Sequence, residues 1–328
     1  MVRALVTGAT GCVGANIVEA LLTRGYEVRA LRRASSRLEA LSGLDPELVV
    51  GDVLDQASLS RAMVGCELVF HAAAVSRYWH SSTAMLYRVN VTGTRNVLEA
   101  ARQAGVQRVV LTSSVAVLGV PTRETPIRDE RSPLNLAPRR FPYAHSKLLA
   151  EAEASRAVEM GLDVVCVNPA TVIGRRDINF VGGEILKIVK SGWLLAAPAG
   201  GMGVVAASMA GLGHVLAAER GSAGARYVLN GENVKHSDLL ATVAEVVGSR
   251  SPLVTLPRMP IRALMAGAWA VFSALGRPLP PALTQLDLSW RDMFFDGSRA
   301  RDELGFPSHS ARYAVEEAWA WYKGHGLL

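Results

Sequence analysis

The chain has 328 residues, of which 50% are hydrophobic and 20% charged, a composition typical of a globular protein with a substantial core. Three cysteines, Cys12, Cys66 and Cys166, lie in or beside apolar runs without the spacing of metal ligands, so neither disulfides nor a metal site is expected. The net charge of +6 comes from basic residues scattered in pairs rather than gathered in a stripe, which argues against a nucleic-acid partner.

No segment predicts a membrane span or a signal peptide. Glycines interrupt the apolar residues at the N-terminus, and the longest apolar run, residues 263–275, has 13 residues where a bilayer needs about 20. We expect this run to form a buried helix, with a membrane-facing patch as the alternative. A cytoplasmic location is the resulting expectation.

Apolar strand-like runs alternate with helical patterns from the N-terminus to residue 169. The runs are short, rich in valine and leucine, and predict strands at 3–7, 27–31, 47–51, 67–73, 108–114 and 163–169. Helical spacing between them predicts helices at 13–22, 57–63, 94–104 and 144–160. Strands that are apolar throughout and separated by helices indicate an α/β fold with a doubly wound parallel sheet, the Rossmann arrangement.

After Pro169 the pattern changes to a smaller, mostly helical C-terminal lobe that we expect to bind the substrate. Helices are predicted at 182–191, 237–247, 261–275 and 313–323, with one more strand at 225–231. The predicted cofactor domain is residues 1–170, completed by about 205–231. The predicted substrate-binding lobe is 171–204 together with 232–328.

The first strand runs directly into the sequence TGATGCVG, which places Gly8, Gly11 and Gly14 between a strand and a helix. Such a turn needs glycine where the backbone bends and approaches a pyrophosphate, and the helix N-terminus favours the negative charge. The pattern therefore predicts a dinucleotide site, formed also by the neighbouring loop residues Thr10, Cys12 and Val13.

The end of the second strand indicates which dinucleotide binds. The sequence RALRRASSR offers Arg32, Arg33 and Arg37 and no carboxylate. A guanidinium suits the 2′-phosphate of NADP, whereas NAD is usually held by an acidic residue at this point. NADP(H) is favoured over NAD(H), unless these arginines point into solvent.

Further candidates for cofactor binding follow the next strands at the same sheet edge, where ligands of such folds bind. Asp52 and Val53 could contact the adenine, and the small Ala72 and Ala73 would allow close backbone approach. Thr112 ends the fifth strand. Each could equally belong to a plain loop.

Ser114 follows the fifth strand, and YAHSK places Tyr143 and Lys147 four residues apart, on one face of the next predicted helix. A neighbouring ammonium favours the phenolate and would lower the pKa of Tyr143 from its ordinary value near 10. The three side chains could then converge on a nicotinamide, with Tyr143 as acid-base group. The alternative is an ordinary surface pair on an amphipathic helix.

The motifs TGATGCVG, GDVLD, HAAA, NVTGT, TSS, YAHSK and NPATVIG occur in this order, and together they resemble the extended short-chain dehydrogenase/reductase superfamily, also described as the NAD-dependent epimerase/dehydratase family. YRVNVTGTRNVLEAA and VNPATVIGRRDI look most like dihydroflavonol reductases and hopanoid-associated sugar-epimerase-like proteins. The resemblance implies a catalytic triad of Ser114, Tyr143 and Lys147, and a nicotinamide contact by Asn168 and Pro169, with Thr171 nearby. It also implies a possible homodimer through helices 94–104 and 144–160.

One segment departs from the family pattern. Relatives usually carry a Val-x-Val-Asp-Asp-like stretch near residue 200, and this chain has GVVAASMAG at 203–211. The loss of these acids puts the geometry between the two lobes in doubt, and with it the substrate contacts.

The leading hypothesis is an NADPH-dependent oxidoreductase that reversibly reduces a ketone or aldehyde, with a small-molecule carbonyl compound as its partner. Val115 and Ala116 supply no acid-base group beside Ser114, which argues against a dehydratase. A nucleotide-sugar epimerase with retained NAD(P), using Arg175 or Arg176 for the diphosphate, and a noncatalytic NADP-binding sensor are the alternatives.

The substrate pocket is predicted from aromatic and apolar residues that could wall it, although such residues are more often simple core. The candidates are Tyr78, Trp79, Ser114, Leu118 and Tyr143, with contributions from Phe180, Trp193, Met202 and Trp290.

Overall fold

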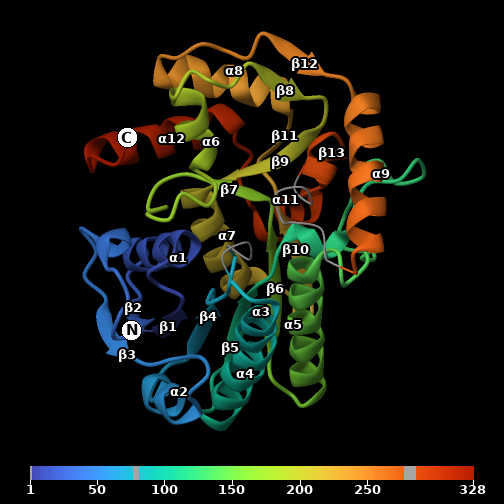
Figure 1. Ribbon diagram of the computed structural model, residues 1–328. Coiled ribbons are helices and arrows are strands. Elements are labelled where there is room, and N and C mark those ends of the chain that lie inside the picture. The colour runs from blue at the N-terminus through green and yellow to red at the C-terminus, as the bar shows by residue number, and fades with distance from the viewer. Residues whose placement is uncertain (1, 77–80, 277–285) are drawn as a thin grey trace.

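The computed structural model describes residues 2–76, 81–276 and 286–328. Its largest element is a parallel seven-stranded sheet with the strand order β10-β6-β5-β4-β1-β2-β3 (Figure 1). Its strands are β1 (Arg3–Thr7), β2 (Glu27–Arg32), β3 (Glu47–Val50), β4 (Leu68–His71), β5 (Arg108–Thr112), β6 (Val164–Pro169) and β10 (Arg226–Leu229). The predicted doubly wound parallel sheet is confirmed, and the strand expected at 225–231 is its edge strand β10.

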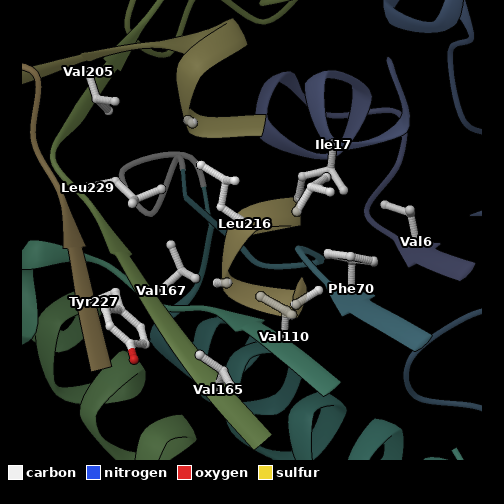
Figure 2. Packing of buried hydrophobic residues seen from close by; sticks show 14 of the residues in the cluster. Val6, Ile17, Phe70, Val110, Val165, Val167, Val205, Leu216, Tyr227 and Leu229 are labelled. Carbon is white, nitrogen blue, oxygen red and sulfur yellow. The ribbon is translucent and has the colours of Figure 1, made fainter. Parts of the chain in front are cut away.

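Helices cover both faces of this sheet. One face carries α1 (Cys12–Thr23) and α7 (Ala207–Arg220), and the other carries α2 (Gln56–Met63), α4 (Gly93–Gln103) and α5 (Pro142–Glu159). Because side chains alternate along a strand, Val6 packs in the first layer and Leu5 in the second, and both are fully buried. Figure 2 shows the first layer, in which valines of the strands pack near Ile17 of α1 and Leu216 of α7.

Helix α7 is an element that the sequence pattern does not predict, as are the shorter α3 (Thr83–Tyr87) and α11 (Ser298–Leu304). Its segment contains Gly211 and Gly213, which lower the intrinsic preference for a helix. In the fold Gly211 is required, because a Cβ there would overlap the backbone of Asn16 in α1. Close packing of the two helices therefore outweighs propensity.

The smaller part of the molecule combines the expected helices with short strands that were not predicted. The helices are α6 (Glu184–Lys190), α8 (His236–Val247), α9 (Arg258–Ala274) and α12 (Ala311–Gly324). One small sheet contains β7 (Thr171–Ile173), β9 (Gly201–Ala206), β11 (Glu232–Lys235) and β13 (Asp292–Met293), and a second pairs β8 (Ala196–Pro198) with β12 (Val254–Leu256). These strands have two to six residues, too few for a clear alternating pattern.

The expectation of a buried helix over 263–275 is wrong. Helix α9 stands at the edge of the molecule (Figure 1, orange), and only Ile261 and Met265 of its residues are buried. Leu264 and Val271 are 64% and 56% exposed. Across the described parts of the chain, no helix has both the length and the apolarity needed to cross a bilayer.

Candidate active site

A cavity of about 860 Å³ lies at the carboxyl edge of the seven-stranded sheet. Residues that follow β1, β2, β4 and β5 line one end, and residues of the smaller part, such as Met202 and Met293, line the other. The strand order reverses at β1: β2 and β3 follow on one side of it, and β4, β5 and β6 follow on the other side. Ligands bind at this reversal of strand order in open parallel sheets.

The turn between β1 and α1 is built by backbone contacts that only glycine allows. Gly8 has a φ of 68°, and a Cβ there would lie 2.6 Å from the amide nitrogen of Ala73. A Cβ on Gly14 would overlap the carbonyl of Gly8. A Cβ on Gly11, in contrast, would meet only the Gly8 oxygen, at 3.4 Å, and would take up room in the cavity.

The N-terminus of α1 is free to receive an anion. Gly11 is the N-cap, makes no side-chain capping bond, and the first turn carries no acidic residue. Unpaired amides and the helix dipole together favour a phosphate at such a position. Thr10, Cys12 and Val13 line the cavity beside it. The residues therefore fit the pyrophosphate of a dinucleotide.

Two of the three arginines after β2 reach the cavity. Arg32 and Arg33 line it together with Ser36. Arg32 donates to the carbonyls of Arg33 and Ala34, at 3.3 Å each, while its buried Nε has no hydrogen-bond partner among the described residues. Arg37 is not part of the lining and pairs with Glu39, so its cofactor contact stays a prediction. The loop after β2 places the Arg37 side chain outside the cavity.

The residues expected near the adenine and the nicotinamide also line the cavity: Asp52, Val53, Ala72, Ala73, Thr112, Pro169 and Thr171. The Asp52 carboxylate accepts from the amide of Leu54, at 2.9 Å. Asn168 does not line the cavity, contrary to expectation. Its side-chain nitrogen donates to the Ser114 carbonyl oxygen at 3.2 Å and to Glu151 at 2.7 Å, so it supports the site from behind.

Ser114, Tyr143 and Lys147 converge on the cavity from two elements. Ser114 caps a 3₁₀ turn over Val115–Leu118 and accepts from the Ala116 amide at 3.2 Å. Tyr143 lies in the first turn of α5, where Pro142 at its start fixes the entry of the helix, and it hydrogen-bonds Ser114. Lys147, one turn later, donates to the Thr112 carbonyl oxygen at 2.7 Å. The side-by-side placement expected from the spacing is present.

The electrostatics of these groups differ from the sequence expectation. Burial raises the pKa of Tyr143, and its hydrogen bond to Ser114 only partly opposes this rise. Burial lowers the pKa of Lys147 to about 8, while the nearby Glu151 carboxylate raises it. The expected lowering of the Tyr143 pKa by Lys147 is thus wrong, because the loss of solvation dominates for the phenol and the ammonium points to Thr112.

Two buried histidines organise the strand ends behind the cavity. His214 Nδ1 lies 2.7 Å from the Ala210 carbonyl, which only accepts, so its Nε2 accepts from the Thr112 hydroxyl at 2.9 Å. Burial, with a further contribution from Lys147, lowers the pKa of His214 to about 4 and that of His71 to about 3. Both rings are therefore neutral at physiological pH.

Asn90 is a structural residue of the site that the sequence analysis did not assign, although the motif NVTGT contains it. It lies in a π-helical turn, Arg88–Thr92, a feature often found at functional sites. Its side-chain oxygen accepts from the Val75 amide at 2.8 Å, and its nitrogen donates to the Ser146 hydroxyl at 3.0 Å. Asn90 thereby ties the loop after β4 to helix α5.

The predicted substrate wall is only partly present. Met202 lines the cavity, while Leu118 is fully buried in the core, Phe180 stacks on Tyr322, and Trp290 packs beneath α9. Trp193 is 86% exposed. Tyr78 and Trp79 lie outside the described residues. The wall consists instead mainly of residues from segments with no recognisable motif: Leu136, Arg140, Phe141, Val181, His236, Leu288, Ser289, Met293 and Phe295.

Arg175 and Arg176, the candidates for a diphosphate, are not part of the lining. Arg175 pairs with Glu19 at 3.2 Å and lies near Glu317. Arg176 pairs with Glu19 at 3.0 Å and donates to the carbonyls of Ala40 and Ser42. Both arginines hold the smaller part of the molecule against α1 and the loop after β2.

The segment that departs from the family pattern, 203–211, forms most of β9 and the start of α7. A carboxylate from a distant element contacts the start of α7. The Glu317 carboxylate of α12 accepts from the amides of Ser208 and Arg175, at 3.2 Å each, and from the Ser208 hydroxyl. A carboxylate at the N-terminus of α7 is favoured by the helix dipole. Glu317 therefore links α12 to the start of α7 and to the backbone at Arg175.

Comparisons with known proteins agree with this geometry. The model of the NAD dependent epimerase/dehydratase family matches residues 4–191. A Synechocystis sp. protein provisionally named dihydroflavonol 4-reductase is 38% identical, over 98% of this chain and 95% of that protein. Sterol demethylase protein B of Methylococcus capsulatus is 34% identical, over 99% of both. The crystal structure of gox2253 superposes with a TM-score of 0.90 at 35% identity, covering 99% of each chain.

The fold and these relatives define an extended short-chain dehydrogenase/reductase, an enzyme of the NAD(P)-dependent oxidoreductase kind. The chain belongs to the NAD dependent epimerase/dehydratase family.

The glycine turn gives a matched pair of substitutions. Gly11→Ala should weaken NAD(P)H binding about tenfold, equivalent to about 1.4 kcal/mol, with little loss of stability, because the new methyl group enters the cavity. Gly14→Ala should instead lower the free energy of unfolding by about 1–3 kcal/mol, because the methyl group overlaps backbone. Fluorescence titration and chemical denaturation measure the two effects. Equal behaviour of the two variants would contradict this division.

The low pKa of Lys147 predicts a pH dependence of cofactor binding. The ammonium is a hydrogen-bond donor below its pKa of about 8, and the charge is lost as the pH rises through that value. Because Lys147 lines the cavity, the Kd of NAD(P)H should increase from pH 7 to pH 9.5. Lys147→Arg, which stays charged, should show a flat profile even if its binding is weaker. A flat wild-type profile would show that the Lys147 charge does not contribute.

Proposed function

We propose that the protein is an NADPH-dependent reductase of a ketone or aldehyde, working reversibly as an alcohol dehydrogenase. The observation that carries the proposal is the convergence of Ser114, Tyr143 and Lys147 at the boundary between the dinucleotide end and the apolar end of one cavity. A protein that only binds NADP would not need these three side chains together.

The bound nicotinamide cofactor would supply the hydride. In the proposed mechanism Ser114 and Tyr143 hold the substrate carbonyl oxygen by hydrogen bonds, and Tyr143 donates its proton as negative charge develops there. The raised pKa of Tyr143 suits this direction, because the phenol is protonated when the carbonyl compound binds. Lys147, held by the Thr112 carbonyl, would donate to the ribose hydroxyls and orient the ring.

The preference for NADPH is supported by the residues at the end of β2. Arg32 and Arg33 line the cavity, and the Arg32 Nε is a buried donor without a partner among the described residues. A 2′-phosphate would satisfy that donor, whereas a ribose hydroxyl offers no compensating charge. No carboxylate of residues 31–38 would repel it.

The charge of the lining supports a neutral carbonyl substrate over a sugar nucleotide. Its basic side chains, within the described part of the chain, are Arg32, Arg33, Arg140 and Lys147. Of these four, Arg140 lies nearest the smaller part of the molecule. It pairs with Asp287, and its Cζ lies 3.9 Å from the centre of the Trp269 ring. Among the described lining residues, no unpaired lysine or arginine is thus left at that end for a diphosphate. The reductase name of the Synechocystis relative is in keeping with this proposal.

The wider organisation is part of the same proposal. Residues 1–170 with about 205–231 would bind the cofactor, and 171–204 with 232–328 the substrate. The cavity is lined from both sets, which supports this division. A cytoplasmic location is supported by three free cysteines. A homodimer through α4 and α5 stays a prediction from the family resemblance.

Tyr143→Phe tests the acid-base role. The variant should lower kcat for carbonyl reduction about 10²- to 10⁴-fold while the Kd of NADPH changes less than about threefold. Tyr87→Phe is the matched control, because it also removes a phenol oxygen near α5, one that bonds His145 and does not line the cavity. Near wild-type turnover by Tyr143→Phe would exclude the proposed role. Bound NADPH without net oxidation by any carbonyl in the wild type would favour an epimerase.

Arg32 and Arg33 test the cofactor preference. Their joint replacement by serine should weaken NADPH binding about 100-fold, because charged hydrogen bonds to the 2′-phosphate are lost, and leave the Kd of NADH nearly unchanged. Arg37→Ser, at a residue that pairs with Glu39 outside the cavity, is the control and should change neither. Equal weakening of both cofactors in the double variant would contradict a 2′-phosphate site.

A further inference from the structure

Helix α9 is apolar on both of its faces. Its inner face packs Ile261, Met265 and Trp269 into a small cluster with Trp290. Its outer face exposes alanine, leucine and valine side chains, and between Arg262 and Ser273 it carries no polar side chain. A helix facing water normally presents charged residues on its outer face, and one that is apolar all round is normally covered. The outer face of α9 therefore requires a covering surface.

The exposed apolar surface continues from α9 into the neighbouring strands. Strand β12 pairs with β8, and the Leu253 amide donates to the Leu195 carbonyl oxygen at 3.0 Å, so these segments lie side by side. Leu253 is 81% exposed. We define the apolar ridge as Trp193, Leu195, Leu253, Val254, Leu256, Met259, Leu264, Val271 and Leu275, all exposed. Contiguous exposed apolar surface of this kind marks an interaction site.

The charge of the segments that build the ridge has one sign. Residues 246–276 contain three arginines, Arg250, Arg258 and Arg262, and no aspartate or glutamate. Residues 185–218, which include β8, contain Lys187 and Lys190 and again no acid. Arg258 is paired with Asp292, while Arg250, Arg262 and both lysines are exposed. The partner that fits is apolar and negatively charged.

We propose that the apolar ridge docks the protein on the surface of a lipid bilayer that contains anionic phospholipid. Helix α9 has 17 residues, about 25 Å at 1.5 Å per residue, and would lie in the plane of the interface with its outer face among the acyl chains. Arg250 and Arg262 would contact the headgroups, and Trp193 suits the boundary between water and lipid. In this arrangement the protein binds to one leaflet of the bilayer and α9 does not span it.

The inner face of α9 connects the ridge to the cavity. Trp269 stacks on Arg140, and Arg140, Leu288 and Ser289 line the cavity wall. Helix α9 would therefore separate the bilayer from the end of the cavity where we propose that the substrate binds. The docking itself does not depend on the proposed reaction.

Sedimentation with lipid vesicles tests the proposal on the full-length protein. We expect it to pellet with vesicles of phosphatidylcholine containing about a third of phosphatidylglycerol, at least tenfold more than with phosphatidylcholine alone, and less as salt rises. Leu264→Glu combined with Val271→Glu should reduce binding at least tenfold. Arg250→Gln combined with Arg262→Gln should weaken binding and flatten its salt dependence.

A matched control is Val64→Glu combined with Met160→Glu, which places the same charges on exposed apolar residues far from the ridge in sequence. It should bind vesicles like the wild type. Because Leu264 and Val271 lie outside the cavity, their double variant should keep its NADPH affinity, which checks that it is folded. Wild-type protein that ignores anionic vesicles, or a ridge variant that still binds them, would overturn the proposal. So would a wild-type dimer that the ridge variant breaks, without vesicle binding, since the cover would then be a second copy.

Discussion

A lysine ammonium buried under the carboxyl edge of a sheet must be paired, since an isolated charge in such a place would be too costly. Lys147 meets this condition through the Thr112 carbonyl oxygen, 2.7 Å away, and through the nearby Glu151. The same charge helps to keep His71 and His214 neutral, so that their rings act as fixed links between strands and helices. The bond from Lys147 to Thr112 thus ties α5 to the end of β5, and Tyr143 lies one turn earlier on the same helix.

The two ends of the cavity differ in the charged groups that are available to a ligand. The dinucleotide end has free donors, namely the first amides of α1 and the arginines after β2. At the other end, Arg140 is neutralised by Asp287 and stacked on Trp269, and burial lowers the pKa of His236. Arg175 and Arg176 are engaged in holding the two parts together. Anion recognition is thus confined to where the cofactor is expected.

Much of the large sheet, and the grouping of Ser114, Tyr143 and Lys147, could be predicted from the sequence, because both depend on local sequence. Buried parallel strands are apolar throughout, the glycine turn has a fixed spacing, and Tyr143 and Lys147 share a helix face. The predictions that failed concern features that depend on tertiary packing. Glycine-containing α7 is a helix because it packs closely against α1, where a Cβ at Gly211 would overlap the Asn16 backbone. The composition of α9 predicts burial, but its position at the edge leaves one face uncovered.

The edge strand β10 comes late in the chain, and this affects how the protein folds during synthesis. β6 pairs with β5 on one side and with β10 on the other, and Tyr227 of β10 is held by Glu303 of α11 at 2.7 Å. A nascent chain that ends before β10 would leave the amides and carbonyls of apolar β6 unpaired, an arrangement prone to association with other strands. The sheet is therefore complete only when the chain has left the ribosome as far as Leu229, and fragments that end before β10 should be recovered as aggregates.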